Sequence, residues 1–201
     1  QCIRFWPEYE VLAQMVSSGA LGAVQAARFT RLSAPPGWAS EGWLANSRLS
    51  GGALLDLHIH DVDFILSLFG KPKAVLARAV NGVDHVVASY LYDDMVCTAE
   101  GGWIMPPSFP FEMGYQVLGE KGLLEFSLAK SPSLRFYPRE GEPFTPEYQP
   151  ATGYQNELAY FVSCIESGTA PERVTPESAR DSVAMVVAEE QSINSGTVVT
   201  L

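Results

Sequence analysis

The spacing of apolar residues between positions 51 and 69 predicts one long amphipathic helix. Apolar side chains recur there at intervals of four and three residues. They are Leu55, Ile59, Val62, Leu66 and Phe69. This spacing places them on one face of an α-helix. Gly70 follows the last of them and Pro72 comes soon after, which is typical of a helix end.

A β-strand is the alternative for the first half of this segment. Apolar and polar residues alternate strictly from Leu55 to His60, and alternation is the pattern of a strand. A His-x-His strand end is also a familiar arrangement of metal ligands. The alternation stops at Asp61, whereas the helical spacing continues to Phe69, so we favour the helix.

Patterns elsewhere predict further helices, at residues 7–18, 156–166 and 176–193. Predicted strands are at residues 24–32, 74–80, 85–91, 96–104, 111–118, 123–127, 133–137 and 198–201. Several consecutive strands without an intervening helix indicate antiparallel pairing. We therefore expect an α+β fold, with a large, mostly antiparallel open sheet and helices packed on one face. Residues 33–50 are expected to form a long loop, which in a compact domain is usually functional or mobile.

A sheet covered by helices on one side only leaves a second face for another partner. Several strand residues are candidates for an apolar outer face. They are Val75, Ala77, Ala79, Val87, Ser89, Leu91, Val117 and Leu123. A large exposed apolar patch usually marks an interface, so we expect a homo-dimer or homo-tetramer. The alternative is that these residues fill a two-layer core.

Composition and charge narrow the classes of function. The chain has 201 residues, a length that suits one domain. Its net charge of −10 argues against nucleic acid or an anionic membrane as a partner. The three cysteines are far apart and predict neither a disulfide framework nor a metal site, so a reducing cytoplasm is expected. The chain begins with Gln rather than Met, which suggests a part of a longer protein.

Candidate chemistry is concentrated between positions 56 and 63. On the predicted helix, Asp56, His60 and Asp63 lie on a common face, next to the apolar one. Residues four apart are neighbours on a helix, so Asp56 can orient the imidazole of His60, which would then act as a general base. The simpler alternative is a solvated acidic edge of an amphipathic helix. A metal site built from His58, His60 and Asp63, with His85 as a further ligand, is the other alternative.

The sequence contains no glycine-rich phosphate-binding motif of the Gly-x-Gly-x-x-Gly or Gly-x-x-x-x-Gly-Lys-Ser/Thr type. We therefore expect no cofactor-binding site within this chain alone.

At the level of motifs, the chain resembles the C-terminal domain of the Gfo/Idh/MocA (glucose-fructose oxidoreductase/inositol dehydrogenase) family, from about Arg4 to Leu201. The segment from Gly51-Gly52 through Asp56, His60 and Asp63 is similar to the family's signature helix. Weaker similarities lie in residues 4–9, 18–24, 119–126 and in the two C-terminal helices, 157–161 and 176–182.

The resemblance implies that residues 1–201 are the substrate-binding and oligomerisation domain of a two-domain NAD(P)-dependent oxidoreductase. The missing N-terminal domain would be a Rossmann fold that binds NAD or NADP. Asp56 and His60 would be catalytic, together with a lysine of that missing domain. His58 stands where many members have glycine. This fragment alone is expected to be inactive.

The implied substrate is a small polyol or sugar: a sugar, a cyclitol or a dihydrodiol oxidised at a CH–OH group. We expect substrate contacts from His58 and Asp63, and from Trp38 and Trp43 in the loop 33–50. The alternative is that the tryptophans pin the loop to the sheet. Two other functions remain open: a metal-dependent hydrolase that uses His58, His60 and Asp63, and a catalytically silent binding or scaffold domain.

Overall fold

The computed structural model describes residues 1–37 and 42–201 as one sheet and its covering helices. The helical elements, in chain order, are η1 (Cys2–Phe5), α1 (Pro7–Ser17), η3 (Trp43–Ala45), α2 (Ser47–Ser50), η4 (Leu54–His58), α3 (Ile59–Phe69), α4 (Gly153–Ser167) and α5 (Pro176–Ser195). The strands are β1 (Val24–Leu32), β2 (Ala74–Val80), β3 (His85–Leu91), β4 (Val96–Gly102), β5 (Glu112–Gly119), β6 (Gly122–Ser127), β7 (Leu134–Pro138) and β8 (Val199–Thr200).

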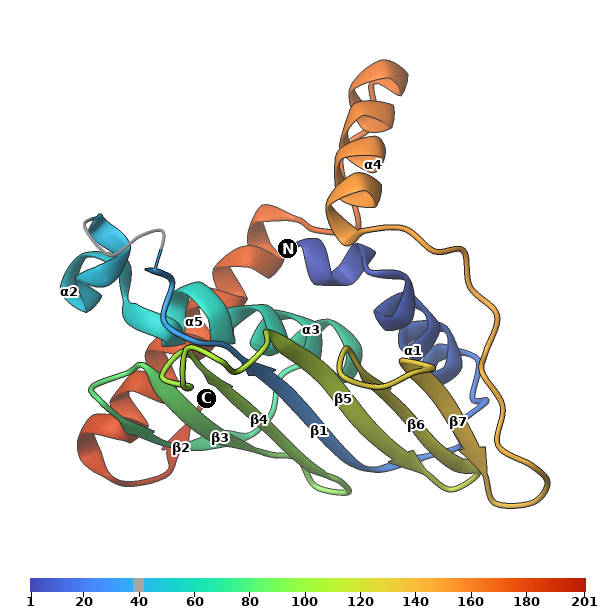
Figure 1. Ribbon diagram of the computed structural model, residues 1–201, viewed down its shortest axis with the longest axis horizontal. Coiled ribbons are helices and arrows are strands. Elements are labelled where there is room, and N and C mark those ends of the chain that lie inside the picture. Colours follow the sequence, from blue (N-terminus) through green and yellow to red (C-terminus); the bar gives the residue numbers. More distant parts are fainter. Residues whose placement is uncertain (38–41) are drawn as a thin grey trace.

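All eight strands form a single open sheet in the order β7-β6-β5-β1-β4-β3-β2-β8. Among the strands of the described residues, only the central β1–β4 pair is parallel, and the other pairs are antiparallel. The predicted α+β class and the mostly antiparallel open sheet are confirmed. Figure 1 shows β1 in the middle of the sheet, with strands from later in the chain on both sides.

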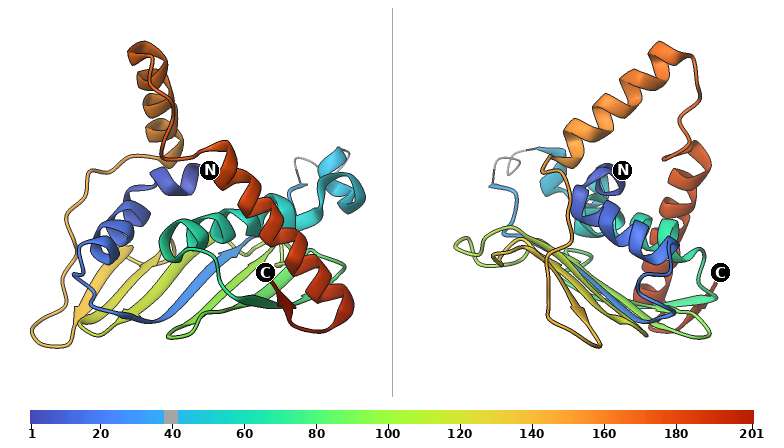
Figure 2. Two further views of the ribbon diagram at one scale, coloured as in Figure 1. Left: turned by 180° about the vertical axis from the view of Figure 1, so that it is seen from behind. Right: turned by 90° about the vertical axis from the view of Figure 1, so that its right-hand side faces the viewer.

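The core lies between the inner face of the sheet and the helices α1, α3 and α5. Figure 2 shows these helices on the same side of the sheet. Tyr9 of α1 packs edge-on against Phe64 of α3 and against Tyr115 and Phe126 of the sheet. Such aromatic pairs each contribute about 0.5–1.5 kcal/mol beyond the burial of their area.

Local signals set the ends of the two C-terminal helices. Thr152 and Thr175 cap the N-termini of α4 and α5, and each forms a reciprocal capping box with the residue three positions on. Gly168 and Gly196 end the same helices in the left-handed conformation, which costs glycine little. The start of α5 coincides with the predicted helix at 176–193, whereas α4 begins three residues before the predicted start at 156.

The outer face of the sheet is more polar than predicted. Val75, Ala77 and Val117 point toward the helices and are fully buried, so their placement on an outer apolar face is wrong. Val87 and Leu91 of β3 do point outward and are exposed. Around them the outer face carries ion pairs such as Arg28–Glu100 and Lys130–Glu125.

Helix α4 departs from the layer. Figures 1 and 2 show it projecting away from the sheet beyond the other helices. No helix in residues 1–37 and 42–201 is long and apolar enough to cross a lipid bilayer.

Candidate active site

Two consecutive glycines begin the signature segment. Gly51 has a φ of 79° and Gly52 a φ of 64°, both in the left-handed region that favours glycine. A Cβ atom on Gly52 would lie 2.7 Å from Cγ2 of Val83, in the turn between β2 and β3. The pair therefore lets the backbone turn sharply while it passes close to the sheet.

The predicted helix 51–69 is present but not uniform. Leu54–His58 forms a π-helical turn, η4, and only then does the α-helix α3 begin. Backbone hydrogen bonds fix the start of this turn to the β2–β3 turn: Ala53 N–H donates to Asp84 Oδ1 at 3.2 Å, and Leu54 N–H donates to the carbonyl of Val83 at 3.1 Å. A π turn of this kind is often found at functional sites.

Four residues of the predicted apolar stripe face the core: Ile59 and Val62 are buried, and Leu66 and Phe69 pack against the core. Leu55, the first residue of that stripe, is 39% exposed. Leu54 and two polar residues, His58 and Asp61, face the core instead and are almost completely buried. Partners from other elements compensate for burying these polar groups, and the apolar spacing along the segment does not reveal such partners.

His60 and Asp56 both lie half-buried at this segment. Burial, and secondarily the positive charge of Arg31, lower the pKa of His60 to about 4, so the ring is neutral at pH 7. Its Nδ1 is buried without a hydrogen-bond partner. Burial raises the pKa of Asp56. No hydrogen bond joins Asp56 to His60 within the described residues, so the expected pairing is not formed in this structure.

Asp61 is held by Arg31 of β1, and both are buried. Arg31 Nε donates to Asp61 Oδ2 at 2.8 Å and Arg31 Nη2 donates to Oδ1 at 3.2 Å, so the pair is bidentate. A buried charge is tolerated only when it is paired and hydrogen-bonded in this way. This pair therefore ties α3 to the middle of the sheet.

Asp63 was expected to contact substrate, but the structure places it in the core with no exposed surface. Arg4 donates to both of its carboxylate oxygens at 2.7 Å. Ser182 of α5 donates a third hydrogen bond at 2.8 Å. Through these hydrogen bonds, Asp63 connects α3 to η1 and α5.

His58 was also expected at the substrate, and it too is fully buried. Its Nε2 lies 3.2 Å from Oε2 of Glu189 on α5 and 3.4 Å from the hydroxyl of Tyr90 on β3. Burial alone would lower the pKa of His58, but the carboxylate of Glu189 outweighs burial and raises it. His58 therefore points into the core, whereas Asp56 and His60 lie only half-buried.

Trp38 and Trp43 are the two aromatic residues that were expected to contact substrate. Trp38 lies outside the described residues, and Trp43 is 60% exposed on η3. The neighbouring Leu44 is buried against Ala53 and Trp103, which anchors this part of the loop. A cavity of about 400 Å³ lies beside that cluster. The residues that line it are Pro35, Pro36, Gly37, Leu44, Ser47, Asn81, Asp84, Trp103 and Ile104.

The geometry gives no support to a metal site. His85 faces the outer side of the sheet, where its Nε2 lies 3.1 Å from Glu100, whereas His58 is buried on the inner side. Among the residues that the structure describes, no three histidines, cysteines or carboxylates are grouped so that they could hold a metal ion.

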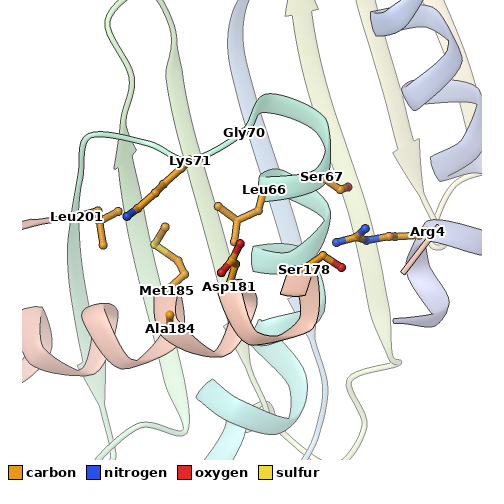
Figure 3. A pocket seen from close by; sticks show the side chains of 10 residues that line it. All are labelled: Arg4, Leu66, Ser67, Gly70, Lys71, Ser178, Asp181, Ala184, Met185 and Leu201. Carbon is orange, nitrogen blue, oxygen red and sulfur yellow. The ribbon is translucent and has the colours of Figure 1, made fainter. Parts of the chain in front are cut away.

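A further pocket, of about 440 Å³, lies between α3 and α5. Figure 3 shows Arg4 and Ser178 at one end of it and Lys71 and Leu201 at the other. Neither Asp56 nor His60 lines this pocket. The candidate catalytic pair is therefore not enclosed by either of these cavities.

Sequence reasoning missed the buried partners Arg31, Glu189 and Tyr90. For Arg31 a signal exists: it continues the alternation of Ala27 and Phe29 on the inner face of β1. A charged residue at an inward strand position must meet an opposite charge. No comparable signal marks Glu189, because it lies on a helix with many polar positions.

Comparison with known proteins identifies relatives of this structure. Residues 9–125, more than half of the chain, match the family model described as the GFO/IDH/MocA C-terminal domain. No protein with a curated description matches the sequence.

Several solved structures share the fold. Aldose-aldose oxidoreductase from Caulobacter crescentus, complexed with glycerol, is similar with a TM-score of 0.83 and 21% identity, over 100% of this chain and 62% of that one. Levoglucosan dehydrogenase, in complex with NADH and levoglucosan, has a TM-score of 0.81 and 17% identity, over 99% of this chain and 64% of that one. UDP-N-acetylglucosamine 3-dehydrogenase from Acidithiobacillus ferrooxidans has a TM-score of 0.76 and 18% identity, over 96% and 60%. The chain thus spans less than two thirds of these proteins.

Proposed function

We propose that this chain, which belongs to the family of GFO/IDH/MocA C-terminal domains, is the substrate-side domain of an NAD(P)-dependent oxidoreductase. The reaction is the oxidation of a CH–OH group in a sugar, cyclitol or dihydrodiol, or its reverse. The observation that carries the proposal is the neutral, half-buried His60 on a segment with the family's signature. The sugar dehydrogenases with the same fold support this choice of substrate class.

His60 is the proton acceptor in this proposal. Oxidation of an alcohol removes the hydroxyl proton as well as a hydride, and a neutral imidazole can take that proton. A pKa of about 4 is low for this task, and a closed site with the Asp56 carboxylate beside the ring would raise it. Asp56 is thus assigned to orient His60 and to stabilise its charged form once the site is complete.

The nicotinamide cofactor would supply the hydride exchange at the reacting carbon. This chain has no glycine-rich turn to hold the pyrophosphate. Its residues fit a place beside the substrate, and a separate nucleotide-binding domain is assigned to hold the dinucleotide.

The exposed face of α4 supports such a second domain. Five large apolar side chains on this helix are between 50% and 66% exposed, and they are Tyr154, Leu158, Phe161, Val162 and Ile165. A nucleotide-binding domain packed against this apolar face would bury it, and that burial would contribute to holding the two domains together.

Self-association through the outer face of the sheet completes the proposal. Val87, Leu91 and Val96 are exposed there, next to charged pairs that a second copy can match. A homo-dimer or homo-tetramer is the expected assembly.

The test is an activity assay of this chain joined to its nucleotide-binding domain. Sugars, cyclitols and dihydrodiols are supplied with NAD and with NADP, and reduced cofactor is followed by absorbance. His60→Ala should lower kcat by about 10²–10⁴-fold, the usual contribution of a general acid–base group. His85→Ala is the matched control, because that histidine lies on the outer face of the sheet. Absence of turnover with every substrate, or full activity of His60→Ala, would contradict the proposal.

A further inference from the structure

We propose that His58, Glu189 and Tyr90 form a buried positioning cluster that holds in place the backbone of the segment carrying Asp56 and His60. The inference rests on the proposed function in one respect: the segment that the cluster holds is taken to carry the catalytic residues. These residues come from three elements, η4, α5 and β3, and all are almost completely buried. None of them reaches the surface to contact substrate, so the cluster acts through the backbone of the turn.

The contacts of the cluster centre on the carboxylate of Glu189. The Tyr90 hydroxyl donates to Glu189 Oε1 at 2.7 Å. The ring nitrogen Nε2 of His58 lies 3.2 Å from the other carboxylate oxygen, Oε2, and 3.4 Å from the Tyr90 hydroxyl. A fully buried carboxylate requires a nearby positive charge, and His58 supplies that charge when its ring is protonated.

Other charged groups face His58 as well. The carboxylate of Asp61 favours the protonated ring, and Arg31 disfavours it. Because Asp61 and Arg31 are paired with each other at 2.8 Å, their opposite influences largely cancel. Glu189 is therefore the group that decides the charge of His58.

The cluster is the second of two anchors on the catalytic turn. The first is at the start of the turn, where Ala53 and Leu54 bind the β2–β3 turn. His58 anchors the other end to α5 and β3. Asp56 lies between these two anchors, and His60 follows the second by two residues. A turn held at both ends keeps both side chains in a fixed place.

The sheet is shaped to receive this histidine. A Cβ atom on Gly101 of β4 would lie 2.7 Å from Nδ1 of His58 and 2.8 Å from its Cβ. The imidazole therefore lies directly on the backbone of β4, where only glycine leaves room. The absence of a side chain at Gly101 thus leaves the space that the imidazole of His58 fills.

The experiment compares His58→Gln, Glu189→Gln and the double variant with the unmodified chain. His85→Gln is the control, because His85 also lies 3.1 Å from a glutamate but on the outer face of the sheet. Amide hydrogen exchange of residues 54–60 is measured, together with the NMR titration of the His60 ring. Each single variant should raise exchange of the turn about tenfold or more, because one polar partner is left buried and unmatched.

The double variant distinguishes positioning from general loss of structure. Its two amides form a neutral pair, so exchange of residues 54–60 should return to within about threefold of the unmodified chain. The His60 titration, whose pKa is about 4 in the unmodified chain, should move upward in the single variants and return in the double variant. His85→Gln should change neither quantity. Unchanged exchange and an unchanged His60 titration in a folded single variant would overturn the inference, and so would a folded double variant without recovery.

A second measurement uses the two-domain enzyme. His58→Gln should lower kcat about tenfold or more while the KM for the dinucleotide stays within about threefold, and the double variant should recover kcat. If the unmodified enzyme oxidises no alcohol, the proposed function fails but the exchange result for the cluster still stands. If the enzyme is active and His58→Gln leaves kcat unchanged, the positioning role is wrong.

Discussion

Replacing His60 by glutamine should remove part of the acid sensitivity of the folded chain. Burial and Arg31 lower the pKa of His60 from an ordinary value of 6.5 to about 4. Between these two values the unfolded chain binds a proton at this position and the folded chain does not. Stability must therefore fall as the pH falls through this window.

The size of the effect follows from the two pKa values. For this group alone, the free energy of unfolding should fall by about 2.5 kcal/mol between pH 7 and pH 4.5. The ring is only half-buried, and solvent screening reduces the expected loss to about 1–2 kcal/mol. His58 does not interfere, because it is present in both proteins. Its pKa is raised, so it stabilises the fold at low pH, and that contribution is lost as the pH rises through its folded pKa.

Urea unfolding at pH 7 and at pH 4.5, for the unmodified chain and for His60→Gln, measures the difference. Carboxylates that titrate in the same pH range are present in both proteins, so their contributions cancel in the difference between the two losses. The unmodified chain should lose about 1–2 kcal/mol more than the variant. Equal losses, within about 0.5 kcal/mol, would refute the argument that the His60 ring is kept neutral by burial.

Two further changes test the buried contacts around the segment that carries Asp56 and His60. In urea unfolding, Arg31→Met should destabilise the chain by about 3–5 kcal/mol, because it leaves the carboxylate of Asp61 buried without its partner. Adding Asp61→Leu should restore much of this loss. A single variant as stable as the unmodified chain would contradict the prediction. Gly101→Ala should cost about 1–3 kcal/mol in thermal unfolding, because the new methyl group meets the ring of His58. Gly37→Ala is the comparison, because that exposed glycine has open space around it and no left-handed backbone conformation.

The fold was largely readable from the sequence, because its signals are local. Thr152 and Thr175 as caps, Gly168 and Gly196 as helix ends, and strict alternation in strands such as β1 are each set by neighbouring residues. The predicted strand at residues 24–32 coincides with Val24–Leu32. Consecutive strands without helices between them led directly to the prediction of a mostly antiparallel open sheet, which is confirmed, whereas the order of its strands was not predicted.

The assignment of Asp56 and His60 as a catalytic pair follows from spacing and from the resemblance to a family, and it stays a prediction. The environment of Asp56 and His60 could not be predicted from the sequence. Spacing along a helix brought Asp56 next to His60, yet the π turn of η4 intervenes and no hydrogen bond joins the two in the described residues. Whether a turn is α- or π-helical depends on the contacts at both of its ends, which come from distant parts of the chain.

Tertiary structure alone decided which polar residues are buried. By periodicity Asp61 lies off the apolar stripe, whereas His58, three residues after Leu55 and four before Val62, lies beside it with no partner indicated for its ring. They are buried because Glu189 lies 131 positions after His58 and Arg31 lies 30 positions before Asp61 in the sequence, and the fold brings each pair together. Long-range pairing offsets the cost of removing these charges from water, so a hydrophobic pattern, which records only local periodicity, cannot contain that information.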